Sequence, residues 1–255
     1  MAKEKLKIAF LNINQGYVNR GAETFINEIA DRLKPDFQVD IISGGKPPTK
    51  RWSILWRIFL DPHGLTILWF SLKSLTKIWR EKYDVVIPLN GGWQSVVIRL
   101  ITLAYGGKMV ISGQSGKGWD DRFNLYTFPN AFVAITQTNT AWAKNFNKSI
   151  NVKFIPNGVD LSKFKSNGET YNTKLKKPII ITVAALTETK RVDLAVNAVS
   201  RISDASLLIV GDGHLKDKLK KLADEKLPER YEIICVQYSQ MPSMYRAADM
   251  FCLAP

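Results

Sequence analysis

The feature that most constrains the fold is a pair of short apolar runs that flank a segment of helical periodicity. The runs Ile179–Val183 and Leu207–Val210 consist almost wholly of branched residues, which is typical of strands buried on both faces of a parallel sheet. Between them, apolar residues recur at helical spacing, namely Val192, Ala195, Val196 and Val199. Two parallel strands joined by a helix form a right-handed βαβ unit. The chain is therefore predicted to be an α/β protein.

The loop after the first of these runs ends in two cations, Lys190 and Arg191. In a βαβ unit this loop lies at the carboxyl edge of the sheet, where open α/β sheets bind their ligands. Backbone N–H groups at a helix start attract anions, and the two side chains add positive charge at the same place. We therefore expect a phosphate or diphosphate at this loop. The competing interpretation is a solvated helix end with no ligand.

The same alternation of apolar runs and helical segments continues along the whole chain, which predicts two domains. Expected strands in the first half cover residues 6–13, 37–42, 83–88, 108–112, 131–136 and 152–155. Those in the second half cover 179–183, 207–210, 231–236 and 250–253. The polar segment 163–177 is expected to link two Rossmann-like domains, 1–170 and 171–255. The second domain is expected to be incomplete, because doubly wound domains commonly have about five or six strands.

The net charge of +13 calls for an acidic partner or surface, but charge alone does not separate nucleic acid, anionic lipid and a phosphorylated substrate. The sequence has no zinc-finger spacing, RNA-binding aromatic strand or long basic tail, so nucleic acid is not the expected partner. The start of the chain has no signal-peptide core, which predicts a cytoplasmic protein. Cys235 and Cys252 each lie in an apolar run and are expected to be buried thiols.

The segment 51–82 combines leucines and cations with four tryptophans, Trp52, Trp56, Trp69 and Trp79. Two helices separated by residues 61–64 are expected there. Lys73 and Lys77 interrupt the second helix, so no run of about 20 apolar residues could span a membrane. Basic helices that carry tryptophan tend to lie in the membrane interface. We expect either peripheral contact with the inner face of the membrane or ordinary packing between helices.

The segment VAALTETKRVDLAVNAV, residues 183–199, resembles the donor loop of the retaining GT-B glycosyltransferases of family 4. In that family a Gly-Arg pair precedes a Lys by a few residues, and the two basic residues hold the diphosphate of a nucleotide-sugar. Lys190 matches the Lys, whereas Ala184 and Ala185 stand at the Gly and Arg positions. The resemblance implies that Lys190 binds the donor and stabilises the leaving diphosphate. Arg191 is the candidate to compensate for the missing arginine.

Three further segments carry the resemblance. Arg20–Glu23 is similar to the family's Gly-Gly-x-Glu element, in which the backbone comes close to the donor phosphates, and Gly21 matches the second glycine. Pro156–Asp160 resembles the turn at the crossing into the second domain, and Gly211–Pro255 is similar to the part that follows the donor loop. Many family members carry a His near the reacting sugar. Gln114 stands at the corresponding place and is the second candidate catalytic residue.

The resemblance implies two Rossmann-like domains that face a cleft and transfer a hexose, with retention of configuration, from a UDP- or GDP-sugar. The acceptor would be a saccharide of a cell-envelope polysaccharide, with a lipid-linked sugar among the candidates. No metal or other cofactor is expected, because side-chain cations and helix N-termini would balance the diphosphate. The family's Glu-x7-Glu element would lie beyond Pro255, so we expect a C-terminally truncated chain with little turnover. The alternative is a non-catalytic module that docks on a membrane or a partner protein.

Overall fold

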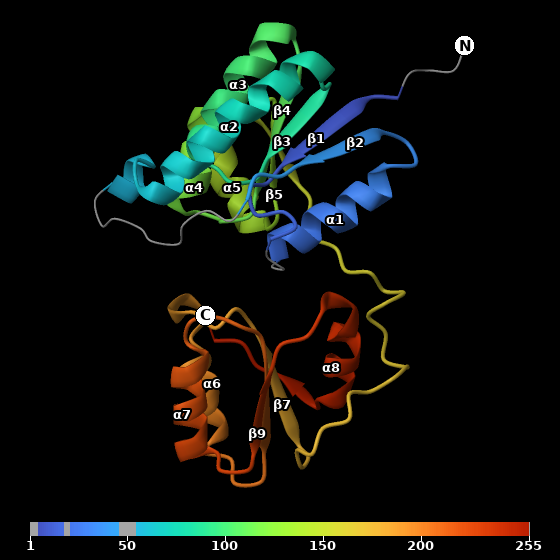
Figure 1. Cartoon of the computed structure of the whole chain (residues 1–255), viewed down its shortest axis with the longest axis vertical. Coiled ribbons are helices and arrows are strands. Elements are labelled where there is room, and N and C mark those ends of the chain that lie inside the picture. The colour runs from blue at the N-terminus through green and yellow to red at the C-terminus, as the bar shows by residue number, and fades with distance from the viewer. Residues whose placement is uncertain (1–4, 18–20, 46–54, 255) are drawn as a thin grey trace. The chain divides into compact units, whose positions relative to one another are not determined.

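The chain divides into two compact α/β units, residues 1–158 and 159–255 (Figure 1). The computed structural model describes residues 5–17, 21–45 and 55–254. The sequence predicted the domain boundary between residues 170 and 171, whereas in the structure residues 159–170 group with the second unit. Each unit contains its own sheet and its own hydrophobic core.

The first unit is built on a six-stranded sheet in the order β2-β1-β3-β4-β5-β6. Its strands are β1 (Lys7–Leu11), β2 (Gln38–Ile42), β3 (Val85–Pro88), β4 (Lys108–Gly113), β5 (Ala131–Ala134) and β6 (Asn151–Phe154). All neighbouring strands are parallel, so the loops that follow their last residues lie at one edge. The chain moves outward from β1 to β2 and then reverses to β3. The sheet therefore has a topological switch point between β1 and β3, where doubly wound folds bind ligands.

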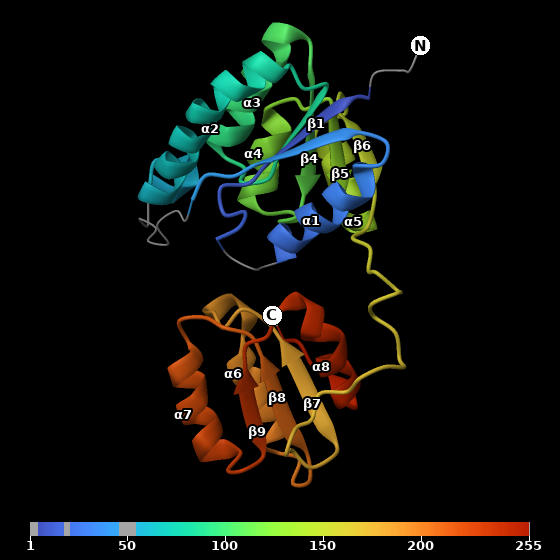
Figure 2. The same ribbon diagram turned by 45° about the vertical axis from the view of Figure 1, so that its right-hand side comes forward.

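Helices cover both faces of this sheet (Figures 1 and 2). One face holds α1 (Gly21–Leu33), whose Ile26 and Ala30 pack against Ile8 and Phe10 of β1. The other face holds α2 (Pro62–Glu81), α3 (Trp93–Tyr105), α4 (Trp119–Tyr126) and α5 (Gln137–Phe146). Alternate β1 residues point into the two cores, as the period of two of a strand requires.

The segment expected to form two helices contains one long helix and a short 3-10 turn. The turn, η1, covers Leu55–Ile58, and α2 then runs for 20 residues. Asp61 caps α2 by accepting the Gly64 N–H at 3.1 Å, and Pro62 occupies the start of the helix. Residues 61–64, which were expected to separate two helices, therefore begin one, because proline is favoured in a first helical turn. Trp52 lies outside the described residues. Among those described, the structure has no helix long and apolar enough to cross a membrane.

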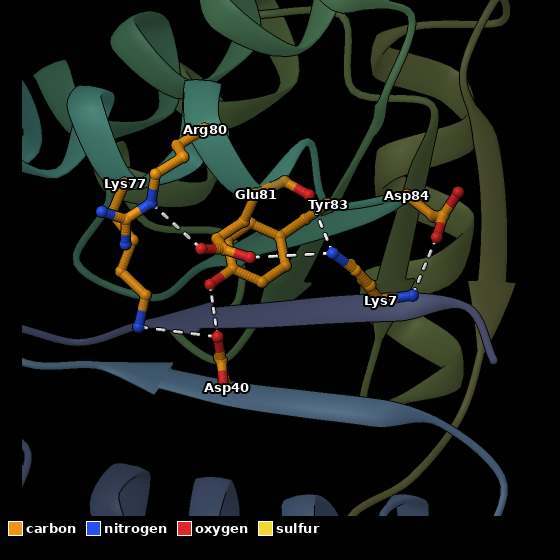
Figure 3. A network of polar contacts seen from close by, with 7 residues as sticks. All are labelled: Lys7, Asp40, Lys77, Arg80, Glu81, Tyr83 and Asp84. Atoms are coloured by element: carbon orange, nitrogen blue, oxygen red, sulfur yellow. Dashed lines mark hydrogen bonds and ion pairs between the residues drawn. The ribbon is translucent and has the colours of Figure 1, made fainter. Parts of the chain in front are cut away.

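A polar network fixes the carboxyl end of α2 against the amino-terminal edge of the sheet (Figure 3). The Tyr83 hydroxyl donates a hydrogen bond to the Asp40 carboxylate of β2, and the Lys77 ammonium of α2 lies 3.5 Å from the same carboxylate. The backbone N–H of Lys7 in β1 donates to Asp84 at 2.8 Å. Burial raises the pKa of Tyr83, and the Asp40 carboxylate raises it further, so the hydroxyl keeps its proton. The Lys77–Asp40 pair holds α2 to β2, and the Lys7 ammonium, 3.6 Å from the Glu81 carboxylate, holds the end of α2 to β1.

The second unit has a four-stranded parallel sheet in the order β10-β7-β8-β9. Its strands are β7 (Ile179–Val183), β8 (Ser206–Val210), β9 (Tyr231–Ile234) and β10 (Met250–Phe251). Helices α6 (Val192–Val199) and α7 (Lys216–Lys226) pack on one face, and α8 (Met241–Ala247) packs on the other. Two 3-10 turns, η2 (Glu188–Lys190) and η3 (Tyr238–Gln240), complete the unit. Every residue of β8 is buried, as expected for a strand covered on both faces.

The polar segment expected to be a linker is attached to the second unit. The hydroxyls of Tyr171 and Thr173 both donate to the Glu232 carboxylate of β9. The Arg246 guanidinium of α8 donates to the Glu169 carbonyl at 2.7 Å. These side-chain bonds explain why the second unit begins well before β7.

The expectation of two buried thiols is wrong for Cys235, whose side chain is exposed. The strand β9 ends at Ile234, one residue earlier than this cysteine, so Cys235 lies in the loop that follows. Cys252 is half-buried, and both cysteines are free thiols.

Candidate functional site

The carboxyl edge of the second sheet is formed by two loops that are bonded to each other. The Leu186 N–H, after β7, donates to the Asp212 carbonyl at 2.9 Å, and the Leu215 N–H donates back to the Leu186 carbonyl at 3.2 Å. A Cβ atom on Gly211 would lie 1.9 Å from the Ala184 carbonyl oxygen, so only glycine permits this approach. The two loops therefore form a single platform at the edge where ligands of α/β sheets bind.

The two cations predicted at this edge occupy different positions relative to α6. Lys190 is the last residue of η2, is exposed, and takes part in no ion pair between residues that the structure describes. Arg191 is the N-cap residue, with φ of 45°, and its guanidinium Nε lies 3.3 Å from the Asp193 carboxylate. No side chain of the described residues caps the first turn of α6. Part of the Arg191 charge is thus balanced by Asp193, whereas the Lys190 ammonium is the cation better placed to meet an anion.

A pair that the sequence did not single out bridges the two loops. The His214 Nε2 atom, after β8, lies 2.9 and 3.0 Å from the two carboxylate oxygens of Glu188 in η2. This hydrogen bond holds the pKa of the Glu188 carboxyl below its usual value. Both side chains are exposed and lie in the loops that carry Lys190. Glu188 and His214 meet only because the fold brings their two loops together, so no local sequence pattern predicts the pair.

The carboxyl edge of the first sheet holds a buried amide network that reasoning from the sequence also missed. The Asn12 side-chain amide, after β1, donates to Glu23 Oε1 at 3.1 Å, and the Asn90 amide, after β3, donates to Asn12 Oδ1 at 3.0 Å. Gln15 donates to Asn27 of α1 at 2.7 Å. Glu23 is only 5% exposed, and its Oε2 atom has no hydrogen-bond partner among the described residues. The available signal was that polar residues follow β1 and β3 at the switch point of the sheet.

Gly21, the predicted donor-contacting glycine of this unit, is the first residue of α1. A Cβ atom added there would meet no atom within 4 Å, and the residue does not adopt a left-handed conformation. Nothing among the residues that the structure describes therefore requires glycine at this position. The prediction that Gly21 gives a ligand room stays a prediction, and the neighbouring Arg20 lies outside the described residues.

Gln114, the predicted second catalytic residue, directly follows β4 and is held by two side chains. Its Nε2 donates to the Ser112 hydroxyl at 2.8 Å, and its Oε1 accepts a hydrogen bond from Asn157 at 3.1 Å. The contact joins Gln114 to the segment Pro156–Asp160, which the sequence had singled out separately. An amide does not titrate, so Gln114 can orient a hydroxyl group but cannot transfer a proton as an acid or base.

Asp121 is a buried carboxyl near Gln114. It lies in the first turn of α4, is 2% exposed, and accepts the Ser115 N–H at 3.0 Å. Burial raises its pKa to about 6. Within the described ranges, no group of three or more His, Cys, Asp or Glu side chains is arranged to hold a metal ion.

A hollow of about 30 Å³ lies at the same edge of the first unit. Its lining residues are Phe59, His63, Gly64, Ile67, Asn90, Gly91, Gly92, Trp93 and Asp120. The hollow has room for a water molecule but not for a sugar ring.

Comparison with known proteins places this geometry in context. Residues 163–255 match the family Glycosyl transferases group 1. The O-antigen biosynthesis glycosyltransferase WbnH of Escherichia coli is 24% identical over 217 residues, which cover 80% of this chain and 63% of WbnH. The chain thus spans 63% of the length of this curated relative.

Solved structures agree in fold. Sucrose-phosphate synthase from Thermosynechococcus elongatus has a TM-score of 0.75 and 14% sequence identity, and the match covers 97% of this chain and 75% of that one. WaaG, a glycosyltransferase involved in lipopolysaccharide biosynthesis, has a TM-score of 0.67 at 12% identity, covering 96% and 74%. The predicted fold class, α/β with two Rossmann-like units of the GT-B type, is confirmed.

Proposed function

We propose that this chain is part of a glycosyltransferase that moves a hexose from a UDP- or GDP-sugar to a saccharide acceptor. One observation carries the proposal. The part of the chain that matches the Glycosyl transferases group 1 family contains the platform at the carboxyl edge of β7 and β8, where Lys190 presents a cation without an acidic partner among the described residues. A diphosphate is the ligand that best fits an exposed cation beside an uncapped helix start.

In this reaction the bond between the sugar and the diphosphate breaks, and negative charge develops on the diphosphate. Lys190 would stabilise that charge, because a cation close to the leaving diphosphate lowers the energy of the transition state. Arg191 would add a weaker contact, because Asp193 lies 3.3 Å from its guanidinium. Gln114 would orient a hydroxyl of the sugar, since its amide is already held by Ser112 and Asn157.

Three further points of the proposal follow from the resemblance of the donor loop. The enzyme would belong to the retaining family 4, it would retain the configuration of the transferred sugar, and it would need no metal or other cofactor. Relatives named for O-antigen and lipopolysaccharide biosynthesis support a cell-envelope polysaccharide as the product. If the acceptor is linked to a lipid, the reaction would take place at the inner face of the membrane. The segment 51–82 is the predicted contact with that membrane.

Titration calorimetry with the wild-type chain tests the donor class. UDP or GDP should bind, whereas the matching nucleosides uridine and guanosine should bind at least about tenfold more weakly, because they lack the charged groups that Lys190 meets. Equal affinities for nucleoside and nucleoside diphosphate would contradict the proposal.

A further inference from the structure

Three acidic side chains lie in the loops after β7 and β8 or in the first turn of α6, and each is paired with a basic group. The pairs are Glu188 with His214 at 2.9 Å, Asp193 with Arg191 at 3.3 Å, and Asp212 with Lys216 at 3.9 Å. Lys190 is the cation of these loops that no acid holds among the described residues. The loops thus balance their own acids and leave one ammonium group for a ligand.

Glu188 lies two residues before Lys190 in the same 3-10 turn, η2. A carboxylate this close attracts the Lys190 ammonium and repels a diphosphate, so a free Glu188 would oppose ligand binding in two ways. In the structure, the two carboxylate oxygens lie 2.9 and 3.0 Å from His214 Nε2, and Glu188 forms no ion pair with Lys190. Because an exposed pair of this kind contributes little to stability, its main consequence is the local charge.

The net charge of this pair depends on the protonation of the imidazole ring. Histidine is the side chain whose charge ordinarily changes between pH 5 and pH 8. With a protonated ring the pair is neutral, whereas with a neutral ring Nε2–H still donates to the carboxylate but the pair carries one negative charge. The other charged groups around the pair are of types that ordinarily keep their charge in this range. They are Lys190, Arg191 and Asp193 in η2 or at the start of α6, and Asp212, Lys216, Asp217 and Lys218 in the loop after β8 or at the start of α7.

We propose that His214 neutralises the Glu188 carboxylate and thereby keeps the Lys190 ammonium available to a diphosphate, so that acidic pH strengthens nucleotide binding. This inference rests on the donor site proposed above and adds a regulation to it. His214 is a positioning residue in this role, because it acts on the ligand only through Glu188. One unit of charge at this range changes the affinity for an anion by about threefold at low salt.

Titration calorimetry with UDP and GDP at pH 6 and low salt tests the inference. His214→Ala should weaken binding about threefold, because the Glu188 charge is no longer balanced. Glu188→Gln combined with His214→Ala should restore the affinity to within about 1.5-fold of the wild type, since the acid is then removed as well. A pair that only braced the two loops would give the opposite result, a double variant at least as weak as His214→Ala.

Two further measurements separate charge from structure. Between pH 5.5 and pH 8, the wild-type affinity should fall about threefold relative to that of the double variant, which has no titrating group at either position. This ratio cancels the titration of the terminal phosphate of the ligand, whose pKa is about 6. At about 1 M salt, the difference between His214→Ala and the wild type should disappear, because charges are then screened within about 3 Å.

Glu225→Gln is the matched control. Glu225 lies at the far end of α7, its side chain is 67% exposed, and it pairs with Lys226 at 2.8 Å. The control should bind both nucleotides within about 1.5-fold of the wild type at pH 6. Circular dichroism and thermal melting verify that all variants are folded.

The pair can also be tested without any nucleotide. His214→Ala should raise the pKa of the Glu188 carboxyl, because the hydrogen bond that lowers this pKa is lost. Carbon-13 NMR of the carboxyl groups measures the change, with the Glu188 signal assigned by its loss in Glu188→Gln. An unchanged pKa would overturn the inference.

The binding results distinguish this inference from the donor proposal. A wild-type chain that binds neither UDP nor GDP overturns both. If the wild type binds a nucleoside diphosphate more tightly than the nucleoside, and His214→Ala binds it equally well at pH 6, the role of His214 is overturned and the donor proposal stands. A double variant as weak as His214→Ala has the same meaning.

Discussion

At the scale of single residues, Gly21 offers a clean separation between structural and functional requirements. A Cβ atom at this position would meet no atom of the described residues within 4 Å. We therefore expect Gly21→Ala to change the free energy of unfolding by less than about 0.5 kcal/mol. If the donor phosphates approach this backbone as the resemblance implies, UDP or GDP affinity should fall about tenfold. Calorimetry and denaturant unfolding measure the two quantities. Unchanged nucleotide affinity would remove Gly21 from the site.

Asp121 should give the protein a characteristic dependence of stability on pH. Its pKa rises from the ordinary 3.8 to about 6 in the folded chain. Between these two values the folded state binds more protons than the unfolded state, so the Asp121 contribution to stability falls as the pH rises through this window. The loss between pH 4 and pH 7 should reach about 2 kcal/mol.

The variant Asp121→Asn carries no titrating group at this position and should lack that loss. Unfolding free energies of both proteins, measured in denaturant at several pH values, test the expectation. A wild-type curve parallel to the variant curve from pH 4 to pH 7 would show that Asp121 does not titrate in this range.

The contacts of single side chains were the part least accessible from the sequence. Asn12 and Asn90 are 78 residues apart, and Glu188 and His214 are 26 residues apart. No local pattern links such pairs, because the fold alone brings them together. Lys190 could be chosen in advance, since a cation after a buried strand has a position fixed by the βαβ unit. The sequence could not reveal that Lys190 lacks an ion-pair partner among the described residues. It also could not reveal that Asp193 partly balances the charge of Arg191.

At the scale of elements, the loops after β7 and β8 are expected to be intolerant of added volume. An alanine at Gly211 would place its Cβ 1.9 Å from the Ala184 carbonyl, so the two loops would have to separate. We expect Gly211→Ala to lower the free energy of unfolding of the second unit by about 3 kcal/mol or more, the range of severe steric strain. Denaturant unfolding followed by circular dichroism measures the change. A loss below about 0.5 kcal/mol would mean that the loops are not held together as described.

Most elements could be predicted, because apolar periodicity identifies strands and helices directly. The strands β1 to β10 all coincide with expected runs, and only β4, β6 and β8 extend beyond them, each by one residue. Helix α4 was missed, since WDDRFNLY has little apolar periodicity and is instead held by Leu125 and the buried Asp121. The start of α2 was misassigned because Pro62 was interpreted as a break, although proline fits a first helical turn.

At the scale of the whole molecule, the order of strands follows from general rules once the elements are known. Parallel strands joined by right-handed crossovers leave few arrangements for a chain that alternates strands and helices. These rules do not predict that residues 159–178 belong to the second unit. That attachment depends on hydrogen bonds from Tyr171 and Thr173 to β9, and on one from Arg246 to the segment itself. A polar segment is typical of a linker until its side-chain bonds are known.

The central claim is that the second unit binds the diphosphate of a nucleotide-sugar through Lys190, and calorimetry of one variant pair tests it most directly. UDP and GDP are titrated into the wild-type chain, into Lys190→Ala, and into Lys220→Ala, which removes an exposed lysine from the middle of α7. Loss of a hydrogen bond to a charged group costs about 1.5 to 3 kcal/mol, so Lys190→Ala should weaken binding by roughly ten- to 150-fold. Lys220→Ala should leave the affinity within about twofold of the wild type. Equal affinities of Lys190→Ala and the wild-type chain for both nucleotides would contradict the account.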